Sequence, residues 1–117
     1  MLELLQMADD VGARPLLVVN AGCSTGDKTC VSGTALEPYI QGALNAVEYV
    51  TGDVSTVWGG KRAAAGRPVP FDLKALGIGN ENCENGESGK QYARNWYVIA
   101  TAVRAKYPHI PLVLGCE

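Results

Sequence analysis

The sequence predicts an α/β fold in which short parallel strands alternate with helices. Three short apolar runs, at residues 16–19, 73–78 and 112–115, have the length and composition of buried strands. A segment with helical periodicity precedes each run, so the expected order is helix, strand, helix, strand, helix, strand. Strands in such an alternation are parallel and their crossovers right-handed. The pattern fits both a doubly wound sheet and a (β/α)8 barrel.

The first helix and strand are predicted from residues 2–19. Gly12 stands where a left-handed helix cap is expected, after residues 2–11, in which one helical face carries Leu4, Leu5, Ala8 and Val11. Pro15 then introduces the run Leu16–Val19, which ends in two valines. A continuous apolar run of this kind is typical of a strand that is buried on both faces of a parallel sheet.

A long loop and the second helix follow. Residues 20–33 are rich in Gly, Ser, Thr and Asp, and this loop is too long to be a simple connection. Thr34 and Glu37 have the spacing of a capping box, which predicts that a helix begins there. The helix would pack on the sheet through an apolar stripe made of Leu36, Ile40, Ala43, Leu44 and Val47.

The second half of the chain repeats the alternation. Residues 51–70 are predicted to be an excursion with one short helix at 61–65, before the strand at 73–78. Ser88 and Gln91 predict a second capping box, and the helix that it starts should end at Tyr107–Pro108. Its apolar face is expected to carry Tyr92, Trp96, Ile99, Ala100 and Val103.

Composition excludes several classes of protein. Of 117 residues, 47% are hydrophobic and 19% are charged, the net charge is −2, and no basic run is present, so nucleic acid is not an expected partner. No apolar stretch approaches the roughly 20 residues of a membrane-spanning helix. The first ten residues lack the basic start of a secretory signal, so the signal of a secreted parent would lie outside this chain.

Neither a metal nor a cofactor is expected. Four cysteines, at positions 23, 30, 83 and 116, show no C-x-x-C spacing, and the single His109 is far from them in sequence. Their even number permits two disulfides, although buried free thiols fit the composition equally well. Gly77 and Gly79 begin a dinucleotide fingerprint, but Asn82 occupies the position of the third glycine.

The candidate site lies at the carboxyl ends of the predicted strands, where functional groups gather in parallel β/α folds. Asn20, Glu81 and Glu117 fall at these ends. Beside Glu81, Asn80 offers an amide that can hold a sugar hydroxyl; the alternative is a turn with a solvated carboxylate. Trp58, in a loop-rich segment, is a further candidate for a sugar site, whereas Trp96 belongs to the predicted core.

Four segments together resemble the family 51 α-L-arabinofuranosidases, and most of all their plant-type branch. The segments are Leu16–Gly22, Ser55–Gly59 with Lys61–Arg62, Gly66–Phe71, and Ile78–Cys83, which contains Gly-Asn-Glu. The likeness covers nearly the whole chain. Gly-Asn-Glu by itself is shared by a wider clan of retaining glycosidases, and the Trp-Gly and Pro-Phe segments make the match more specific.

The resemblance implies that the chain is a fragment of a catalytic (β/α)8 barrel, from its third to its fifth strand. A barrel takes about 250 residues. Glu81 would be the general acid/base, and Asn80 would bind the hydroxyl next to the anomeric carbon. The nucleophile, a second glutamate, would lie outside the chain, so this fragment alone is expected to be inactive. Cys83 and Cys116 would follow adjacent strands closely enough to pair, and Cys23 and Cys30 would close their own loop.

The implied function is release of terminal α-L-arabinofuranosyl residues from an arabinose-containing polysaccharide or oligosaccharide. An extracellular location is favoured for the full-length parent. Two alternatives stay open: another retaining glycosidase of the same clan, such as a cellulase or xylosidase, which would keep Asn80 and Glu81, and a non-catalytic β/α segment that binds carbohydrate.

Overall fold

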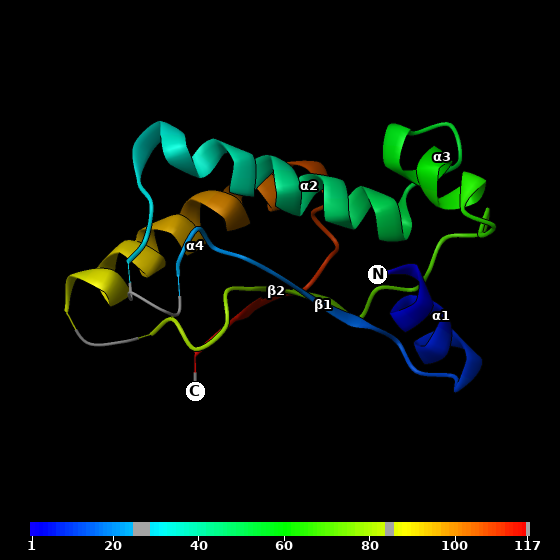
Figure 1. Cartoon of the computed structure of the whole chain (residues 1–117), viewed down its shortest axis with the longest axis horizontal. Coiled ribbons are helices and arrows are strands. Elements are labelled where there is room, and N and C mark those ends of the chain that lie inside the picture. Colours follow the sequence, from blue (N-terminus) through cyan, green and yellow to red (C-terminus); the bar gives the residue numbers. More distant parts are fainter. Residues whose placement is uncertain (25–28, 84–85, 117) are drawn as a thin grey trace.

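The predicted alternation of helices and strands is confirmed by a computed structural model, which describes residues 1–24, 29–83 and 86–116. Figure 1 shows the elements along the chain. They are α1 (Leu2–Asp10), β1 (Leu16–Val19), the 3-10 helix η1 (Gly33–Leu36), α2 (Glu37–Thr51), α3 (Val57–Ala64), β2 (Ala75–Ile78), α4 (Glu87–Lys106) and β3 (Leu112–Leu114).

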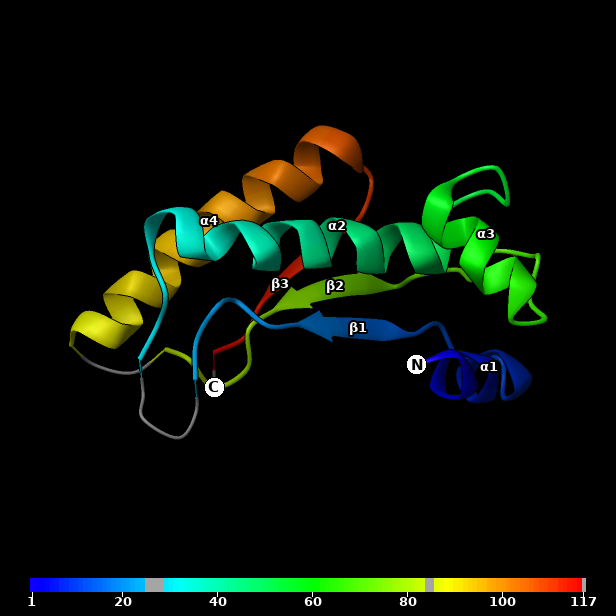
Figure 2. The same cartoon turned by 45° about the horizontal axis from the view of Figure 1, so that its top comes forward.

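The three strands form one parallel sheet in the order β1-β2-β3, as the sequence predicts. Ile78, the last residue of β2, is paired with Val19 of β1 and with Leu114 of β3. All four residues of the central strand β2 are buried. The carboxyl ends of the three strands therefore lie side by side at one end of the sheet (Figure 2).

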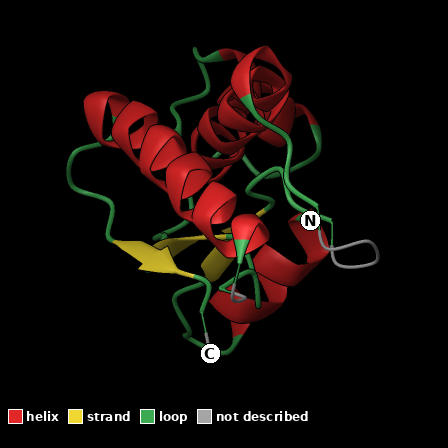
Figure 3. Cartoon of the chain, turned by 90° about the vertical axis from the view of Figure 1, so that its left-hand side faces the viewer, coloured by secondary structure: helices red, strands yellow, loops and turns green. Residues whose placement is uncertain are grey.

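Helices α2 and α4 cover one face of the sheet, and the hydrophobic core lies between them and the strands (Figures 2 and 3). The predicted stripes of both helices largely face this core: Ala43, Val47, Ile99 and Val103 are buried there. They pack in one cluster with residues of the strands, including Leu76 and Ile78, and with the partly buried Leu17, Val19, Ile40, Leu44 and Trp96.

Two apolar surfaces are more open than the sequence predicts. In β1, Leu16 and Val18 are each 50% exposed, so the expected burial of this strand on both faces is wrong. No part of the described chain packs over that face of β1. In α1 only Leu5 is buried, whereas Leu4 and the following Val11 are 68% and 74% exposed, because this helix lies at the edge of the molecule near the amino-terminal end of β1 (Figure 1) and reaches the core only through Leu5 and Leu2.

Helix starts differ from the predicted capping boxes. Neither α2 nor α4 has a side-chain cap hydrogen bond, because η1 winds the chain before α2 and α4 already begins at Glu87. The cap that does form was missed: Thr56 Oγ1 accepts a hydrogen bond from Gly59 N at 3.1 Å. This cap starts α3 at Val57, four residues before the predicted start of the short helix.

Arg62 of α3 is a fully buried cation that binds only main-chain oxygens. Its Nη1 donates to Tyr49 O at 2.8 Å, in the last turn of α2, where carbonyl groups have no partner within the helix. Nη2 donates to Gly52 O and Pro68 O, both at 2.9 Å, and Nε donates to Arg67 O at 3.0 Å. Burial lowers the pKa of Arg62, and the negative end of the α2 dipole favours its charged form.

Replacing Arg62 with Met in the full-length protein is expected to lower the free energy of unfolding by about 3 kcal/mol, because several buried carbonyl groups lose their donors at once. Urea unfolding at pH 7 measures the change. Arg94→Met, at an exposed position of α4, is the matched control and should change stability by less than about 0.5 kcal/mol. A loss no larger than that of the control would contradict this account of Arg62.

Glu48 of α2 connects three helices. Its side chain is 13% exposed, Oε1 accepts a hydrogen bond from Trp58 N at 3.0 Å, and Oε2 pairs with Lys106 Nζ at 2.9 Å. The hydrogen bond from the main chain of Trp58, and then that from Lys106, lower the pKa of Glu48. The ionised carboxylate is therefore the form that stabilises the fold.

Glu48→Gln is expected to lower the free energy of unfolding by about 1 kcal/mol at pH 7. Because the pKa of Glu48 is lower in the folded state, its contribution is complete above the ordinary glutamate pKa of about 4.3 and is lost as the pH falls further. Unfolding midpoints of the two proteins should therefore converge on acidification. The exposed Asp10→Asn is the control, and a difference that persists at pH 3 would contradict the prediction.

Candidate active site

Polar residues follow β1 and β2 at the carboxyl end of the sheet. Asn20 comes directly after β1, and the turn Gly79–Asn82 comes directly after β2. The two segments meet at a hollow of about 180 Å³, which is lined by Val18, Val19, Asn20, Cys23, Gly79, Asn80 and Asn82. The predicted candidates Asn20 and Asn80 are thus brought together. Glu81 lies next to this hollow and is exposed, and Glu117 lies outside the described residues.

Asn20 shapes its own loop. Its Oδ1 accepts hydrogen bonds from Gly22 N at 2.7 Å and from Cys23 N at 3.1 Å. These bonds turn the chain away from β1 immediately after the strand, as Asn side chains commonly do at turns. The side-chain oxygen of Asn20 is therefore engaged with the protein, and a role for this residue in shaping the hollow follows directly from its contacts.

The turn Gly79–Asn82 carries the candidate carboxylate in an unusual backbone conformation. Glu81 has φ +53°, and among the described residues it is the only non-glycine with a positive φ. Asn80 N donates to Asn82 Oδ1 at 2.9 Å, and Asn82 N donates to Gly115 O at 3.4 Å. A left-handed conformation costs a residue with a side chain roughly 1–2 kcal/mol, so contacts around the turn must maintain it.

Tyr92 of α4 forms hydrogen bonds with main-chain atoms at the carboxyl ends of β2 and β3, beside the turn Gly79–Asn82. Its hydroxyl donates to Ile78 O at 2.7 Å and accepts from Gly115 N at 2.9 Å. The side chain is buried, which raises the pKa of Tyr92 and keeps its hydroxyl protonated at neutral pH. Tyr92 was predicted as a core residue, and its hydrogen bonds give it a second role that apolar periodicity does not reveal.

Asn95 lies one turn further along the same helix and was absent from the predicted apolar face. It is buried, and its Nδ2 donates to Ala21 O at 2.9 Å and to Val31 O at 3.0 Å, so it holds the loop that follows β1. Gln91 Nε2 donates to its Oδ1 at 2.9 Å. In the sequence, the signal for this contact is the polar Asn95, three residues after Tyr92 on a helical face that is otherwise apolar.

Both predicted cysteine pairs form disulfides. Cys83 and Cys116 join the segment after β2 to the segment after β3, with their Cα atoms 5.1 Å apart. Cys23 and Cys30 close part of the loop after β1, with Cα atoms 4.0 Å apart. No cysteine is free. One disulfide therefore links the segments after β2 and β3, and the other closes the loop after β1.

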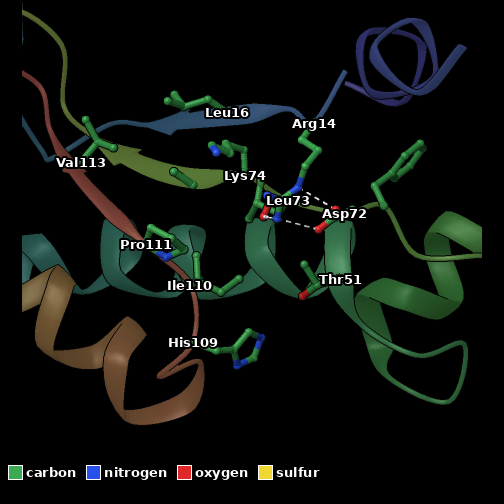
Figure 4. A pocket seen from close by; sticks show the side chains of 12 residues that line it. Arg14, Leu16, Thr51, Asp72, Leu73, Lys74, His109, Ile110, Pro111 and Val113 are labelled. Atoms are coloured by element: carbon green, nitrogen blue, oxygen red, sulfur yellow. Dashed lines mark hydrogen bonds and ion pairs between the residues drawn. The ribbon is translucent and has the colours of Figure 1, made fainter. Parts of the chain in front are cut away.

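A larger hollow, of about 730 Å³, lies at the opposite end of the sheet (Figure 4). Arg14 and Asp72, which both line it, form an ion pair at 2.6 Å, and His109 lies in the turn before β3. In β/α barrels this end of the strands serves stability, whereas catalysis takes place at the carboxyl ends. The hollow is therefore not the candidate active site.

Trp58 also lies toward that opposite end, so its suggested place in a sugar site is not supported by this chain. It belongs to α3, which Figure 1 shows beyond the amino-terminal ends of the strands. Lys61 Nζ stands 3.7 Å from the centre of the Trp58 ring. The ring is thus occupied by a cation–π contact within one helix.

The described residues contain no group of three or more His, Cys, Asp or Glu side chains that could hold a metal ion. In the same part of the chain, no helix has the length and apolar character needed to cross a membrane. The carboxyl end of the sheet does offer the Glu81 carboxylate and the side-chain amides of Asn20, Asn80 and Asn82.

Three parallel strands, helices over one face, and polar groups gathered at the carboxyl ends define a segment of a β/α enzyme fold. The model of the alpha-L-arabinofuranosidase 1 domain matches residues 1–116. The chain belongs to this family.

Relatives in plants and fungi agree with this assignment. Alpha-L-arabinofuranosidase 1 of Arabidopsis thaliana is 40% identical over 116 residues, which are 98% of this chain and 16% of that protein. Probable alpha-L-arabinofuranosidase A of Aspergillus oryzae is 37% identical over 98% of this chain and 18% of its own length. The chain thus spans about one sixth of the length of these relatives.

Solved structures show the same fold. An arabinose-bound GH51 α-L-arabinofuranosidase superposes with a TM-score of 0.87 at 34% identity, over 97% of this chain and 18% of that one. A family 51 α-L-arabinofuranosidase from Bifidobacterium longum gives a TM-score of 0.74 at 26% identity, over 97% of this chain and 21% of that one. The arrangement of strands and helices is therefore that of a segment of these enzymes.

Gly115 tests how tightly the turn is packed. A methyl group at this position would overlap the carbonyl group of Gly79 and would stand 2.9 Å from Asn80 N. Gly115→Ala is therefore expected to lower the free energy of unfolding by about 2 kcal/mol through overpacking. In Gly42→Ala, on α2, the methyl group would meet no atom within 4 Å and should stabilise the helix by up to about 1 kcal/mol. Chemical unfolding of both variants measures the difference, and equal stability would contradict the close packing of Gly115 on Gly79.

Proposed function

We propose that this chain is part of a retaining glycoside hydrolase that releases terminal non-reducing α-L-arabinofuranosyl residues from arabinose-containing polysaccharides. Glu81 is the general acid/base and Asn80 binds the substrate. One observation carries the proposal: in a chain of the α-L-arabinofuranosidase family, an Asn-Glu pair follows the central strand after a single glycine, at the end of the sheet where β/α enzymes act.

We further propose that the chain is the third-to-fifth-strand segment of an eight-stranded barrel. Two features support this. The chain covers about a sixth of its curated relatives, and the outer strands β1 and β3 each have only one neighbour in the sheet. The half-exposed Leu16 and Val18 would then face the barrel interior, where side chains of other strands pack in layers. On this proposal the segment by itself has no activity, because the second carboxylate lies elsewhere.

The mechanism follows from the chemistry of acetal cleavage. A retaining glycosidase places two carboxyl groups about 5 Å apart. Glu81 donates its proton to the glycosidic oxygen as the C–O bond breaks, while the second carboxylate attacks the anomeric carbon and forms a glycosyl ester. Glu81, now ionised, then takes a proton from water, which attacks the anomeric carbon, releases arabinose and restores both carboxyl groups.

Asn80 complements the carboxyl group on the substrate side. Its side-chain amide can donate to and accept from a sugar hydroxyl, and Asn80 lines the hollow beside the turn. Hydrogen bonds to the hydroxyl next to the anomeric carbon strengthen in the transition state, in which the sugar ring gains positive charge. Asn80 thus contributes both to binding and to the rate of bond cleavage.

Glu81→Gln in the full-length enzyme is the direct test. Turnover of natural arabinan should fall by about 10²–10⁴-fold, because the leaving oxygen loses its proton donor. Aryl arabinofuranosides with strongly acidic leaving groups need little protonation, so the first step on these substrates should be largely kept. Steady-state and burst kinetics separate the two steps. Glu87→Gln, at an exposed position six residues further on, is the control. An unchanged rate on arabinan would remove Glu81 from this role.

Two further experiments define the reaction and the substrate. Azide needs no general base, so it should accelerate turnover of the activated substrate by Glu81→Gln and give a glycosyl azide of retained configuration. Reporter glycosides of arabinofuranose and of pyranose sugars, compared in the unmodified enzyme, separate an arabinofuranosidase from a cellulase or xylosidase of the same clan. Binding of arabinan without hydrolysis of any reporter would favour a non-catalytic segment.

A further inference from the structure

The hydroxyl of Tyr92 links β2 and β3 at the point where their pairing ends. Ile78 is the last residue of β2, and Gly115 directly follows β3. The hydroxyl donates to the carbonyl of Ile78 and accepts from the amide of Gly115, with oxygen to heavy-atom distances of 2.7 and 2.9 Å. The same side chain thus fixes both main-chain segments from which the candidate turn departs.

A continuous series of contacts leads from this hydroxyl to the turn. Gly115 packs directly on Gly79, and its carbonyl accepts from Asn82 N at 3.4 Å. The Asn82 side chain then accepts from Asn80 N at 2.9 Å. A side chain at Gly79 would collide with the ring and hydroxyl of Tyr92, so Tyr92 also packs directly against the start of the turn.

This support matters because Glu81 is held in a left-handed conformation and its side chain is exposed. Glu81 is only three positions after Ile78 in the sequence, so a shift of the strand end is transmitted directly to the carboxyl group. A displacement of about 1 Å in a catalytic group can cost about 100-fold in rate. A phenylalanine at position 92 would fill nearly the same space but would lack the hydroxyl that bridges Ile78 O and Gly115 N.

We propose that Tyr92, acting through Gly115 and Asn82, is a positioning residue for proton transfer by Glu81. The inference rests on the proposed function of Glu81 and adds to it a residue on another element. Tyr92 touches neither substrate nor the reacting atoms. Its hydroxyl fixes the main chain on which the acid/base residue stands.

The test is the dependence of kcat/KM on the pKa of the leaving group, measured with a series of aryl α-L-arabinofuranosides on the full-length enzyme. Tyr92→Phe is expected to lower kcat/KM by about 10- to 100-fold for poor leaving groups and by less than about 3-fold for good ones. Weaker proton donation makes the dependence steeper, because poor leaving groups then depart with less assistance. A partly unfolded enzyme loses activity equally on all members of the series.

Tyr97→Phe is the matched control, because Tyr97 lies on the same helix and is 70% exposed. It should keep both the rate and the slope of the unmodified enzyme. Asn82→Ala is a second variant that breaks the same series of contacts without changing the core, and it should also steepen the slope. If Tyr92→Phe fails to fold, an unchanged slope in Asn82→Ala still overturns the inference, because the contacts from Tyr92 reach the turn through Asn82.

An unchanged slope in folded Tyr92→Phe, a uniform loss over all leaving groups, or an unchanged slope in Asn82→Ala would overturn the positioning role. The proposed function has its own distinct failure: no hydrolysis of arabinofuranosides by the unmodified enzyme, or an unaffected Glu81→Gln. If Glu81→Gln loses activity while Tyr92→Phe behaves like Tyr97→Phe, only the inference about Tyr92 fails.

Discussion

Strand β2 is hydrogen-bonded along both edges, and this double pairing is the constraint on which the rest of the structure depends. Parallel register with β1 and β3 fixes where β2 ends, so Ile78 stands level with Val19 and Leu114. The strand is buried along its whole length, which gives a shift of register a large hydrophobic cost. The residues after Ile78 therefore emerge at a defined point on the end of the sheet.

Main-chain groups at the ends of helices and strands are the second constraint, since buried N–H and C=O groups need partners. Three buried polar side chains meet much of this need. Arg62 binds carbonyls around the end of α2, while Tyr92 and Asn95 bind main chain at the carboxyl ends of the strands. The same kind of hydrogen bond has different consequences in the two places. At the end of α2, Arg62 contributes mainly to stability, whereas at the carboxyl ends of the strands Tyr92 and Asn95 set the shape of the candidate site.

The strands, and the place of the candidate residues at the carboxyl end of the sheet, could be predicted from the sequence because both follow from local patterns. Short apolar runs between turn residues gave the strands, and the rule that strand ends carry function pointed to Asn80 and Glu81. Contacts through space could not be predicted in this way. Asn95 bonds Ala21 across 74 positions, and Tyr92 bonds Ile78 across 14. The predicted capping boxes do not form either. A 3-10 helix, η1, precedes α2, and α4 begins at Glu87, so both helix starts differ from those that the local spacing predicts.

A general acid needs two things from its protein: a fixed place and surroundings that favour its protonated form. In this chain the first is built from nearby contacts, because the turn that carries Glu81 is held by Gly115, Asn82 and the Tyr92 hydroxyl. The second is not built here, since the Glu81 side chain is exposed among the described residues. Under the proposed function, the remaining strands must therefore supply the opposing carboxylate and exclude water. On this proposal the two requirements are met by different parts of the full-length enzyme, and the segment described here supplies the geometry of the candidate site.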